Sequence, residues 1–398
     1  MKRRLYIYMA IVCAVAVSCI YPYEVDLKEG TSGTVVISGD ILCGEISKFD
    51  ISLTQSVSDT VSDVFGVHEL YVEGEDGSRY DGTGGKYFVP NHQGGSVGYV
   101  SYEVDTRNLD KNIRYRFVAK ISKGVDSKVY AKTYSTDFMP VLISPPIDSI
   151  SYKVADDSMS VAIQVTTHDD NTPVGCYRWT YEENWEVVSE QMATHAYSYY
   201  SNSVYEIDFE SQNRYYCWGK SVSSDFYLFN TQEMGTNVAP LVTIQTLDRE
   251  EKKLSRLYCI DVTQFVVSEE NYRFWETMRK NTGSAGDIYS PQPGKPRGNI
   301  VCEEDRDEYV IGAVSCTTIS TLRRFITREE FGIYYNSSDC GFRNFDRGQW
   351  QTAYMEGYDI VTIMEGVTPP YLWAKEECVD CTLYGTKNKP DFWPTDNN

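Results

Sequence analysis

A series of short strand-like runs separated by turn residues most constrains what this chain can fold into. Between Thr34 and Phe138 such runs recur at regular spacing and are rich in Val, Ile, Tyr and Thr, which favour strands. Six or seven of them over about 100 residues predict an immunoglobulin-like β-sandwich for residues 31–140. The predicted strands are Val35–Ile41, Phe49–Leu53, Glu69–Glu73, Tyr99–Val104, Tyr115–Ile121 and Val129–Ser135, and the turn signals between them include Glu75–Gly77, Gly82–Gly85 and Asn91–Gly95.

A second, larger β-rich domain is predicted over residues 145–398. Prolines at 140, 145 and 146 mark the joint before it, because proline cannot continue a central strand. One helix is clear at about 268–281, where Ser268 can cap and Tyr272, Trp275 and Met278 recur at helical spacing. Beyond Phe331 the chain is loop-rich. The expected fold is therefore mainly β, with one clear helix in the second domain and a C-terminus stapled by disulfides.

The N-terminus carries the parts of a secretory signal. Basic residues follow Met1, an apolar run extends from Leu5 to Val17, and Ala16–Cys19 resembles a lipobox. The apolar run is shorter than the roughly 20 residues that a membrane-spanning helix needs. We expect residues 1–18 to be a lipoprotein signal peptide, Cys19 to receive the lipid, and residues 19–33 to form a tether.

The charge balance argues against nucleic acid as a partner. The formal net charge is −20, and it becomes −23 once the basic residues of the signal are removed. A chain this acidic repels phosphate backbones and anionic membrane surfaces. Membrane residence is therefore expected to come from the lipid on Cys19.

Nine of the 11 cysteines lie beyond the signal and Cys19. Disulfides are expected in an exported protein, and an odd number leaves at least one free thiol. The candidates for bridges are the four cysteines in polar or loop-like surroundings, Cys217, Cys340, Cys378 and Cys381. We favour Cys378 and Cys381 stapling the tail with Cys217 and Cys340 as partners, although the sequence leaves the pairing open. Half of a zinc site and a redox dithiol are the alternative interpretations of Cys378-x-x-Cys381.

The tyrosine-rich stretch 197–218 is the predicted binding surface. Exposed tyrosines offer large, stiff contact areas that anchor interfaces and can stack on sugar rings. The alternative is that these rings pack into a core. The candidates are Tyr197, Tyr199, Tyr200, Tyr205 and Tyr215.

No convincing catalytic set is present in the sequence. Gly94–Gly98 has the spacing of a nucleophile elbow around Ser96, but a strand pattern follows it where the elbow needs a helix. The four histidines are widely spread, which argues against a histidine-based zinc site, and no cofactor or metal site is predicted. The acidic clusters Asp156-Asp157, Asp169–Asn171 and Glu303–Glu308 are expected to be solvated turns, with calcium at Asp169–Asn171 as the alternative. We expect a non-enzymatic protein, and a surface hydrolase built from scattered carboxylates is the remote alternative.

Several motifs in order resemble a known family. They are Ser18-Cys19, Tyr177–Trp179, Cys217-Trp218, Asn271–Trp275, Pro291–Pro293, Gly298–Ile300, Cys378–Cys381 and Lys389–Trp393. This set is similar to the Bacteroidota outer-membrane lipoproteins that contain domain of unknown function 4249. The resemblance implies a β-rich lipoprotein held in outer-membrane lipid through Cys19, often encoded near TonB-dependent receptors, and it brings no catalytic residues.

The expected function combines the resemblance with the predicted anchor. We expect an accessory or binding subunit beside an outer-membrane barrel, facing the cell surface, with the periplasmic face as the alternative. A glycan and a peptide are the open ligand classes. The second hypothesis is a structural or assembly subunit of an envelope complex without a small-molecule ligand.

Overall fold

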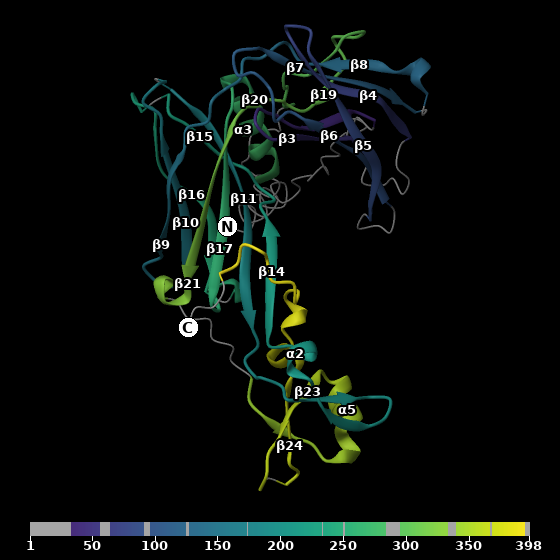
Figure 1. Cartoon of the computed structure of the whole chain (residues 1–398), viewed down its shortest axis with the longest axis vertical. Coiled ribbons are helices and arrows are strands. Elements are labelled where there is room, and N and C mark those ends of the chain that lie inside the picture. The colour runs from purple at the N-terminus through teal and green to yellow at the C-terminus, as the bar shows by residue number, and fades with distance from the viewer. Residues whose placement is uncertain are drawn as a thin grey trace, which may run out of the picture.

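The structure is a computed structural model that describes residues 33–55, 64–90, 96–124, 127–172, 174–232, 234–249, 251–283, 295–332, 340–366 and 368–394. The predicted signal peptide, Cys19 and the tether as far as residue 32 lie outside the described residues. Strands account for 49% and helices for 14% of the structure, so the expectation of a mainly β protein is confirmed. Figure 1 shows an elongated molecule, with the N-terminal strands at one end and the β23, β24 and α5 region at the other.

The N-terminal strands form one continuously hydrogen-bonded sheet of nine strands, which we call the first sheet. Its buried side chains alternate along the strands, as in β1, and Phe49 and Phe117 pack with their ring centroids 4.8 Å apart. The immunoglobulin-like arrangement expected for 31–140 stays a prediction. The strand order is β18 (Val301–Cys302), β8 (Lys132–Ser135), β7 (Tyr115–Lys123), β4 (Phe65–Gly74), β5 (Arg79–Pro90), β6 (Ser96–Asp105), β3 (Ile46–Leu53), β1 (Val35–Gly39) and β19 (Val310–Ile311).

The glycine-rich run predicted as a turn is instead part of β5. Gly84 pairs with Tyr102 of β6, and a Cβ atom at Gly84 would lie 2.2 Å from the Ser101 carbonyl oxygen and 2.7 Å from the Tyr102 ring. Glycine is therefore needed because the neighbouring strand and its ring come too close for a side chain. A turn signal and a close strand contact have the same composition, which explains the wrong prediction.

The first sheet is completed by a segment from much later in the chain, residues 298–317, which we call the return segment. It supplies β18 and β19 at the two ends of the sheet, and β20 (Cys316–Thr317) pairs in parallel with β2 (Ile41–Leu42). Ile300, Cys302 and Val314 are buried in the same core as Val35 and Phe49. The first core therefore draws on residues from both sides of the predicted division at 140–145.

Acidic side chains fasten the return segment to the first sheet. The Glu308 carboxylate accepts hydrogen bonds from Lys123, Lys132 and the Tyr134 hydroxyl at 2.5–2.7 Å. Glu304 accepts from the backbone N–H and the hydroxyl of Thr133. Burial opposes ionisation of Glu308, but these hydrogen bonds outweigh it and lower its pKa to about 2.

The second body packs two further sheets face to face. One carries β16 (Val238–Asp248), β10 (Ser160–His168) and β9 (Ile147–Val154). The other carries β14 (Tyr216–Val222), β11 (Cys176–Val188), β17 (Leu257–Val266) and β21 (Ile319–Thr327), with β15 (Tyr227–Asn230) also paired to β11. Their core includes Ile163 and Leu247 from one sheet and Trp179 and Tyr258 from the other. The Trp179 indole N–H donates to Gln264 Oε1 at 2.9 Å, so its polar atom is satisfied in the core.

The longest helix, α3 (Glu269–Gly283), lies where the sequence predicts one. Ser268 accepts a hydrogen bond from the Asn271 N–H, and Glu269 and Glu270 occupy the first turn, where the helix dipole favours acids. The other helical segments are short, and no helix in the described part of the chain is both long and apolar enough to span a membrane. They are η1 (Lys128–Tyr130), α2 (Phe209–Gln212), η2 (Lys252–Leu254), α4 (Arg328–Phe331), η3 (Arg347–Gln349), α5 (Trp350–Met355), α6 (Glu376–Val379) and η4 (Cys381–Leu383).

The far end of the molecule is a small unit formed by residues 193–213 and 340–381, which we call the aromatic module (Figure 1). It contains the hairpin of β12 (His195–Ser198) and β13 (Ser203–Glu206). Against this hairpin lies a three-stranded sheet of β22 (Arg343–Asn344), β24 (Tyr371–Lys375) and β23 (Tyr358–Ile363). Two segments of sequence about 150 residues apart therefore build one unit.

Candidate functional site

The first sheet, β11 and α3 meet at a buried junction. Arg178 of β11 forms an ion pair with Asp40, which lies between β1 and β2. The Arg178 guanidinium also lies over the rings of Phe265 and Trp275, at 4.4 and 4.7 Å from their centroids. A buried charge is costly unless such contacts compensate it. Because Arg178 and Asp40 come from different sheets, their ion pair fastens the second body to the first sheet.

Two asparagines hold the return segment at this junction. The Asn271 side-chain NH₂ donates to the Val314 carbonyl at 2.9 Å and to the Ser315 hydroxyl at 3.0 Å. The Asn299 side chain donates to the same carbonyl at 2.7 Å and accepts from the Val314 N–H at 2.9 Å. Both asparagines belong to motifs that the sequence analysis used only for the family resemblance, so their structural role was missed.

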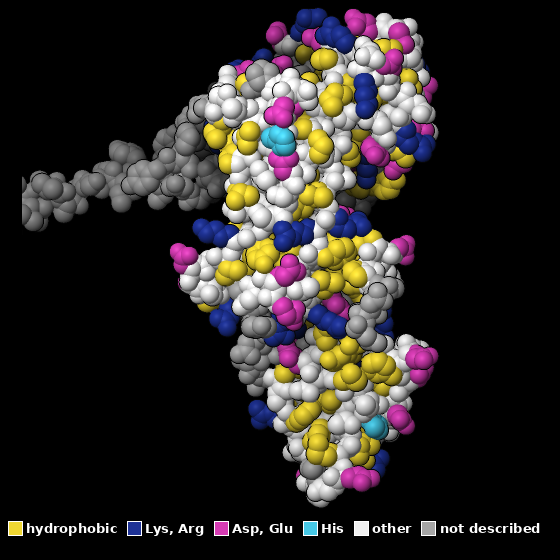
Figure 2. All heavy atoms as spheres, turned by 60° about the vertical axis from the view of Figure 1, so that its left-hand side comes forward, with side chains coloured by type: hydrophobic (Ala, Val, Ile, Leu, Met, Phe, Trp, Pro, Cys, Tyr) yellow, Lys and Arg dark blue, Asp and Glu magenta, His cyan; other side chains and the backbone are white. Residues whose placement is uncertain are grey.

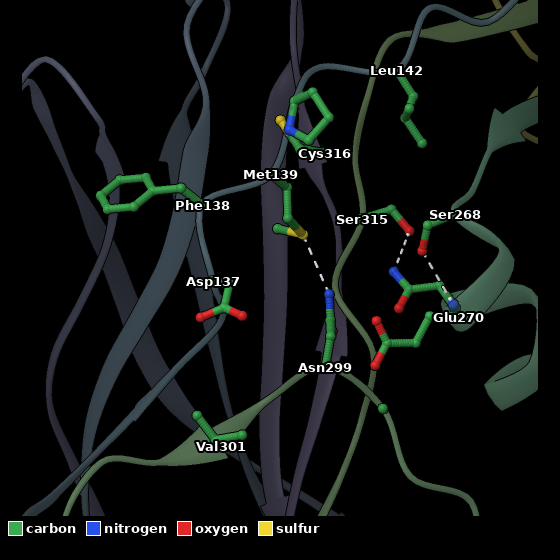
Figure 3. A pocket seen from close by; sticks show the side chains of 13 residues that line it. Asp137, Phe138, Met139, Leu142, Ser268, Glu270, Asn299, Val301, Ser315 and Cys316 are labelled. Carbon is green, nitrogen blue, oxygen red and sulfur yellow. Dashed lines mark hydrogen bonds between the residues drawn. The ribbon is translucent and has the colours of Figure 1, made fainter.

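A cavity of about 300 Å³ opens beside these asparagines. Figure 3 shows that its walls come from three places: the segment after β8, the start of α3 and the return segment. The first of these gives an apolar wall with Phe138, Met139 and Leu142, whereas Asp137 and Glu270 bring carboxylates. The full lining is Asp137, Phe138, Met139, Pro140, Leu142, Ser268, Glu270, Asn271, Gly298, Asn299, Val301, Ser315 and Cys316.

The aromatic module has a core of closely packed rings that meet at steep angles. Tyr197 lies 5.3 Å from Trp373 and 6.1 Å from Trp350, measured between centroids, and both contacts are inclined rather than parallel. Tyr371 packs edge-on against Trp350 at 4.8 Å. Tyr197 is only 6% exposed. It therefore belongs to the core and not to the binding surface that the sequence predicts.

Directly outside this core lies an exposed group of four side chains, Tyr199, Tyr200, Tyr354 and Met355, which we call the tyrosine surface. Tyr200 is 99% and Met355 67% exposed. The Tyr199 ring lies 6.1 Å from that of Tyr200 and 6.0 Å from that of Tyr354. Tyr354 also contacts the buried Tyr197 at 5.5 Å, so the exposed rings rest on a rigid base. Figure 2 shows hydrophobic side chains gathered over this lower end of the molecule.

The remaining two predicted surface tyrosines lie elsewhere. Tyr205 is exposed on β13, but it faces away from Val204, which packs on the aromatic core. Tyr215 packs edge-on against Tyr216 near the start of β14. The structure therefore brings Tyr199 and Tyr200 together and adds Tyr354 and Met355, which no local pattern could have joined to them.

A shallow groove of about 370 Å³ lies on the same module. Its floor includes Trp350 and Tyr371, and Arg347 of η3 stands at its rim over the Trp350 ring at 5.9 Å. Ser203 and Val204 come from the hairpin, and Pro369 closes one side. Trp350 is only 4% exposed, so Tyr371 offers the aromatic face, and the Arg347 guanidinium and the hydroxyls of Ser203 and Tyr371 can hold a small polar ligand by hydrogen bonds.

The four cysteines singled out in the sequence form two disulfides. Cys217 is bonded to Cys381, and Cys340 to Cys378. The first bond ties β14 to the tail, and the second closes the module on itself. Five further cysteines are free and buried: Cys43, Cys176, Cys259, Cys302 and Cys316. Burial raises the pKa of Cys316 to about 12, so that thiol stays protonated.

An ion-pair network supports the attachment of the module. Arg214, which lies between α2 and β14, pairs with Asp359 at 2.6 Å and with Asp380 at 3.3 Å. The carbonyl of Arg214 accepts the backbone N–H of Cys381 at 2.9 Å, next to the disulfide. Covalent and ionic contacts therefore fix the module to the second body at the same place.

Comparison with known proteins identifies the family. The family described as "Domain of unknown function (DUF4249)" matches residues 20–323, about three quarters of the chain. The chain belongs to this family. No curated protein matches it. Every residue that lines the junction cavity lies inside the DUF4249 match, whereas Cys340, Cys378, Cys381 and Tyr354 follow its end.

Proposed function

We propose that this DUF4249 protein is a non-enzymatic accessory subunit, anchored in outer-membrane lipid through Cys19, that holds a partner protein on its tyrosine surface. The partner class is an outer-membrane barrel, with a TonB-dependent receptor as the leading candidate. That class follows from the family resemblance. The cell-surface face of the membrane is the proposed location.

The tyrosine surface is the observation that carries this proposal. Tyr199, Tyr200, Tyr354 and Met355 form an exposed, uncharged group on a chain whose net charge is −20. Tyrosine anchors favour protein interfaces because they bury much area and lose little side-chain entropy. The buried rings of Tyr197, Trp350 and Trp373 hold them in place before any partner arrives.

Affinity purification from detergent-solubilised outer membrane tests the proposal. The full-length protein is expected to bring down a barrel protein, which mass spectrometry identifies. The double variant Tyr200→Ala and Tyr354→Ala is expected to lose it. Tyr130→Ala is the control, because Tyr130 is also exposed, at 69%, but lies beside the first sheet. Purification of the wild-type protein alone, or equal recovery with the double variant, would contradict the proposal.

A ligand-binding subunit for a glycan or a peptide is the second candidate. The groove over Trp350 and Tyr371, with Arg347 at its rim, favours it. A ligand present at a free concentration of a hundred times its Kd should raise the free energy of unfolding by about 2.7 kcal/mol. A thermal-shift screen with oligosaccharides and short peptides, repeated on Arg347→Ala, separates this candidate from an assembly subunit that needs no small ligand.

A further inference from the structure

The chain enters the first sheet at one end of its strands, which we call the entry end. The N–H of Gly33 donates to the Thr54 carbonyl at 2.9 Å, between the start of β1 and the end of β3. The strand pairing places the starts of β4, β6 and β8 and the ends of β5 and β7 at this same end. Side chains at these strand ends therefore lie on the side of the body from which the N-terminal segment leads away.

Three large apolar side chains protrude at the entry end, and we call them the entry surface. Val64 is 57%, Val129 86% and Tyr130 69% exposed. Val64 directly precedes β4, and its carbonyl accepts the Gly124 N–H at 2.7 Å just after β7. Val129 and Tyr130 belong to η1, which leads into β8. Because β4, β7 and β8 are neighbours in the first sheet, the three side chains come from adjacent strand ends.

A pair of tyrosines continues the apolar character of the entry end on β5 and β6. The ring of Tyr87, which is half exposed, stacks on that of Tyr99 at 5.4 Å between centroids. Tyr99 pairs with Ser52 near the end of β3, so both rings lie toward the end where Gly33 enters. Tyrosine favours the boundary between lipid and water, because its ring is apolar and its hydroxyl is polar.

Charged side chains near the entry surface are paired in the described structure. Glu69 of β4 pairs with Lys120 at 3.4 Å and with Lys128 at 2.7 Å, and Glu308 pairs with one lysine of β7 and one of β8. A lysine can also lay its alkyl stem along apolar groups and keep its ammonium group in water. These charges therefore do not prevent the neighbouring apolar side chains from reaching a lipid surface.

The length of chain before Gly33 indicates what meets the entry surface. Cys19, the proposed lipid acceptor, precedes Gly33 by 14 residues. Even a fully extended chain of this length keeps Gly33 within about 50 Å of the membrane. The tyrosine surface lies on the aromatic module, at the opposite end of the molecule from the first sheet (Figure 1).

We propose that the entry surface, together with Tyr87, docks on the lipid headgroup region of the membrane that holds Cys19. The valine side chains and the tyrosine rings enter the boundary between headgroups and acyl chains, and the tyrosine hydroxyls stay among the headgroups. So few side chains bind a membrane weakly by themselves, but the anchor makes their contact intramolecular and raises its effective concentration. The proposal rests on the lipid anchor of the function proposed above and adds the orientation of the body.

Fluorescence quenching tests this contact. The full-length lipoprotein is reconstituted in phosphatidylcholine vesicles with and without a headgroup spin-labelled phosphatidylcholine. An NBD fluorophore on Val64→Cys reports the contact, and wild-type protein carried through the same labelling gives the background from the buried cysteines. We expect the spin label to lower the fluorescence at position 64. NBD on Tyr200→Cys is the control, because Tyr200 is almost fully exposed at the opposite end, and its fluorescence should not change.

Charged substitutions then show whether the entry surface makes the contact. The double variant Val129→Asp and Tyr130→Asp should lose most of the quenching at position 64, because a carboxylate stays in water. Val238→Asp is the control, since Val238 is exposed on β16 of the second body, and it should keep the quenching. All three positions are exposed, so the variants are expected to fold. In detergent the entry surface has no membrane to contact, so Tyr130→Ala remains a control for partner binding.

Flotation with the vesicles separates failure of this contact from failure of the anchor. Protein that does not float lacks the lipid anchor, which overturns the membrane contact and the anchoring proposed above together. Protein that floats with an unquenched label at position 64, or with quenching that the double variant leaves unchanged, overturns the membrane contact alone. A dimer in detergent that the double variant dissociates would assign the entry surface to a second copy of the chain and also overturn the proposal.

Discussion

Arg178 and Asp40 form an ion pair with 2.5 Å between Nη2 and Oδ2, and both side chains are less than a tenth exposed. The other oxygen of Asp40 accepts the Ser315 N–H at 2.8 Å. The Asp40 carboxylate therefore joins β11 of the second body to the return segment that completes the first sheet. The contact lies within reach of α3 as well, since Arg178 stacks on Trp275.

Removal of one partner of this pair should destabilise the whole molecule. Arg178→Met keeps much of the side-chain volume but leaves Asp40 as an uncompensated buried charge, so we expect a loss of about 3–5 kcal/mol in the free energy of unfolding. Urea denaturation measures it. Arg107→Met is the control, because Arg107 forms an exposed pair with Asp105 and should change the free energy by less than about 1 kcal/mol. Similar effects of the two variants would contradict a structural role for the pair.

The two disulfides should differ in their contribution to stability. Cys217–Cys381 closes 164 residues and Cys340–Cys378 closes 38. If each bond acts by restricting the unfolded chain, Cys217→Ser should lower stability by about 5 kcal/mol and Cys340→Ser by about 4 kcal/mol. Melting curves with and without a reducing agent give the comparison. If the disulfide that closes the shorter loop contributes more to stability, the effect of these bonds comes mainly from native contacts and not from the entropy of the unfolded chain.

Protonation of Glu308 at low pH should weaken the attachment of the return segment to the first sheet. Its pKa is lowered from 4.5 to about 2 in the folded protein, so it contributes stability that is fully present above pH 4.5 and is lost as the pH falls toward 2. The shift corresponds to on the order of 3 kcal/mol. Glu308→Gln should therefore be less stable than wild type at pH 7, and the difference should vanish near pH 2. A difference that does not depend on pH would show that packing, not charge, holds the segment.

Truncation of a core ring of the aromatic module should lower the free energy of unfolding strongly, whereas truncation of a surface ring should leave it almost unchanged. Trp373 is completely buried, and Trp373→Ala should lower the free energy of unfolding by about 3–5 kcal/mol. Tyr200→Ala removes an almost fully exposed ring and should change it by no more than about 0.5 kcal/mol. Hydrogen exchange over residues 340–381 reports the local effect. A large stability loss in Tyr200→Ala would mean that this ring serves the fold and not a partner.

Local patterns predicted much of the architecture. The β-rich class and the helix near 268–281 follow from strand propensity, cap residues and helical spacing, which act over a few residues. The four disulfide cysteines also stood out by their polar surroundings. Their pairing did not, because it depends on how β14 and the tail come together in space.

Contacts between residues far apart in the chain could not be predicted from the sequence. The run Glu303–Glu308 resembles a solvated acidic turn, yet Glu304 and Glu308 find partners on β7 and β8, some 170 residues earlier. Which of the candidate tyrosines are buried and which are exposed also depends on such contacts. Tyr197 and Tyr199 are two residues apart on one hairpin, but only the fold decides that the first faces Trp373 and the second faces solvent.

The return segment also sets an order of events during synthesis. Val35 and Val36 of β1 pair with Val310 and Ile311, and β8 at the opposite end pairs with Val301 and Cys302. Until roughly the first 310 residues exist, both margins of the first sheet stay open, and open strand margins invite pairing with other chains. The protein therefore has to protect an unfinished sheet while most of its length is still being made, and fragments that stop near residue 140 should aggregate instead of folding.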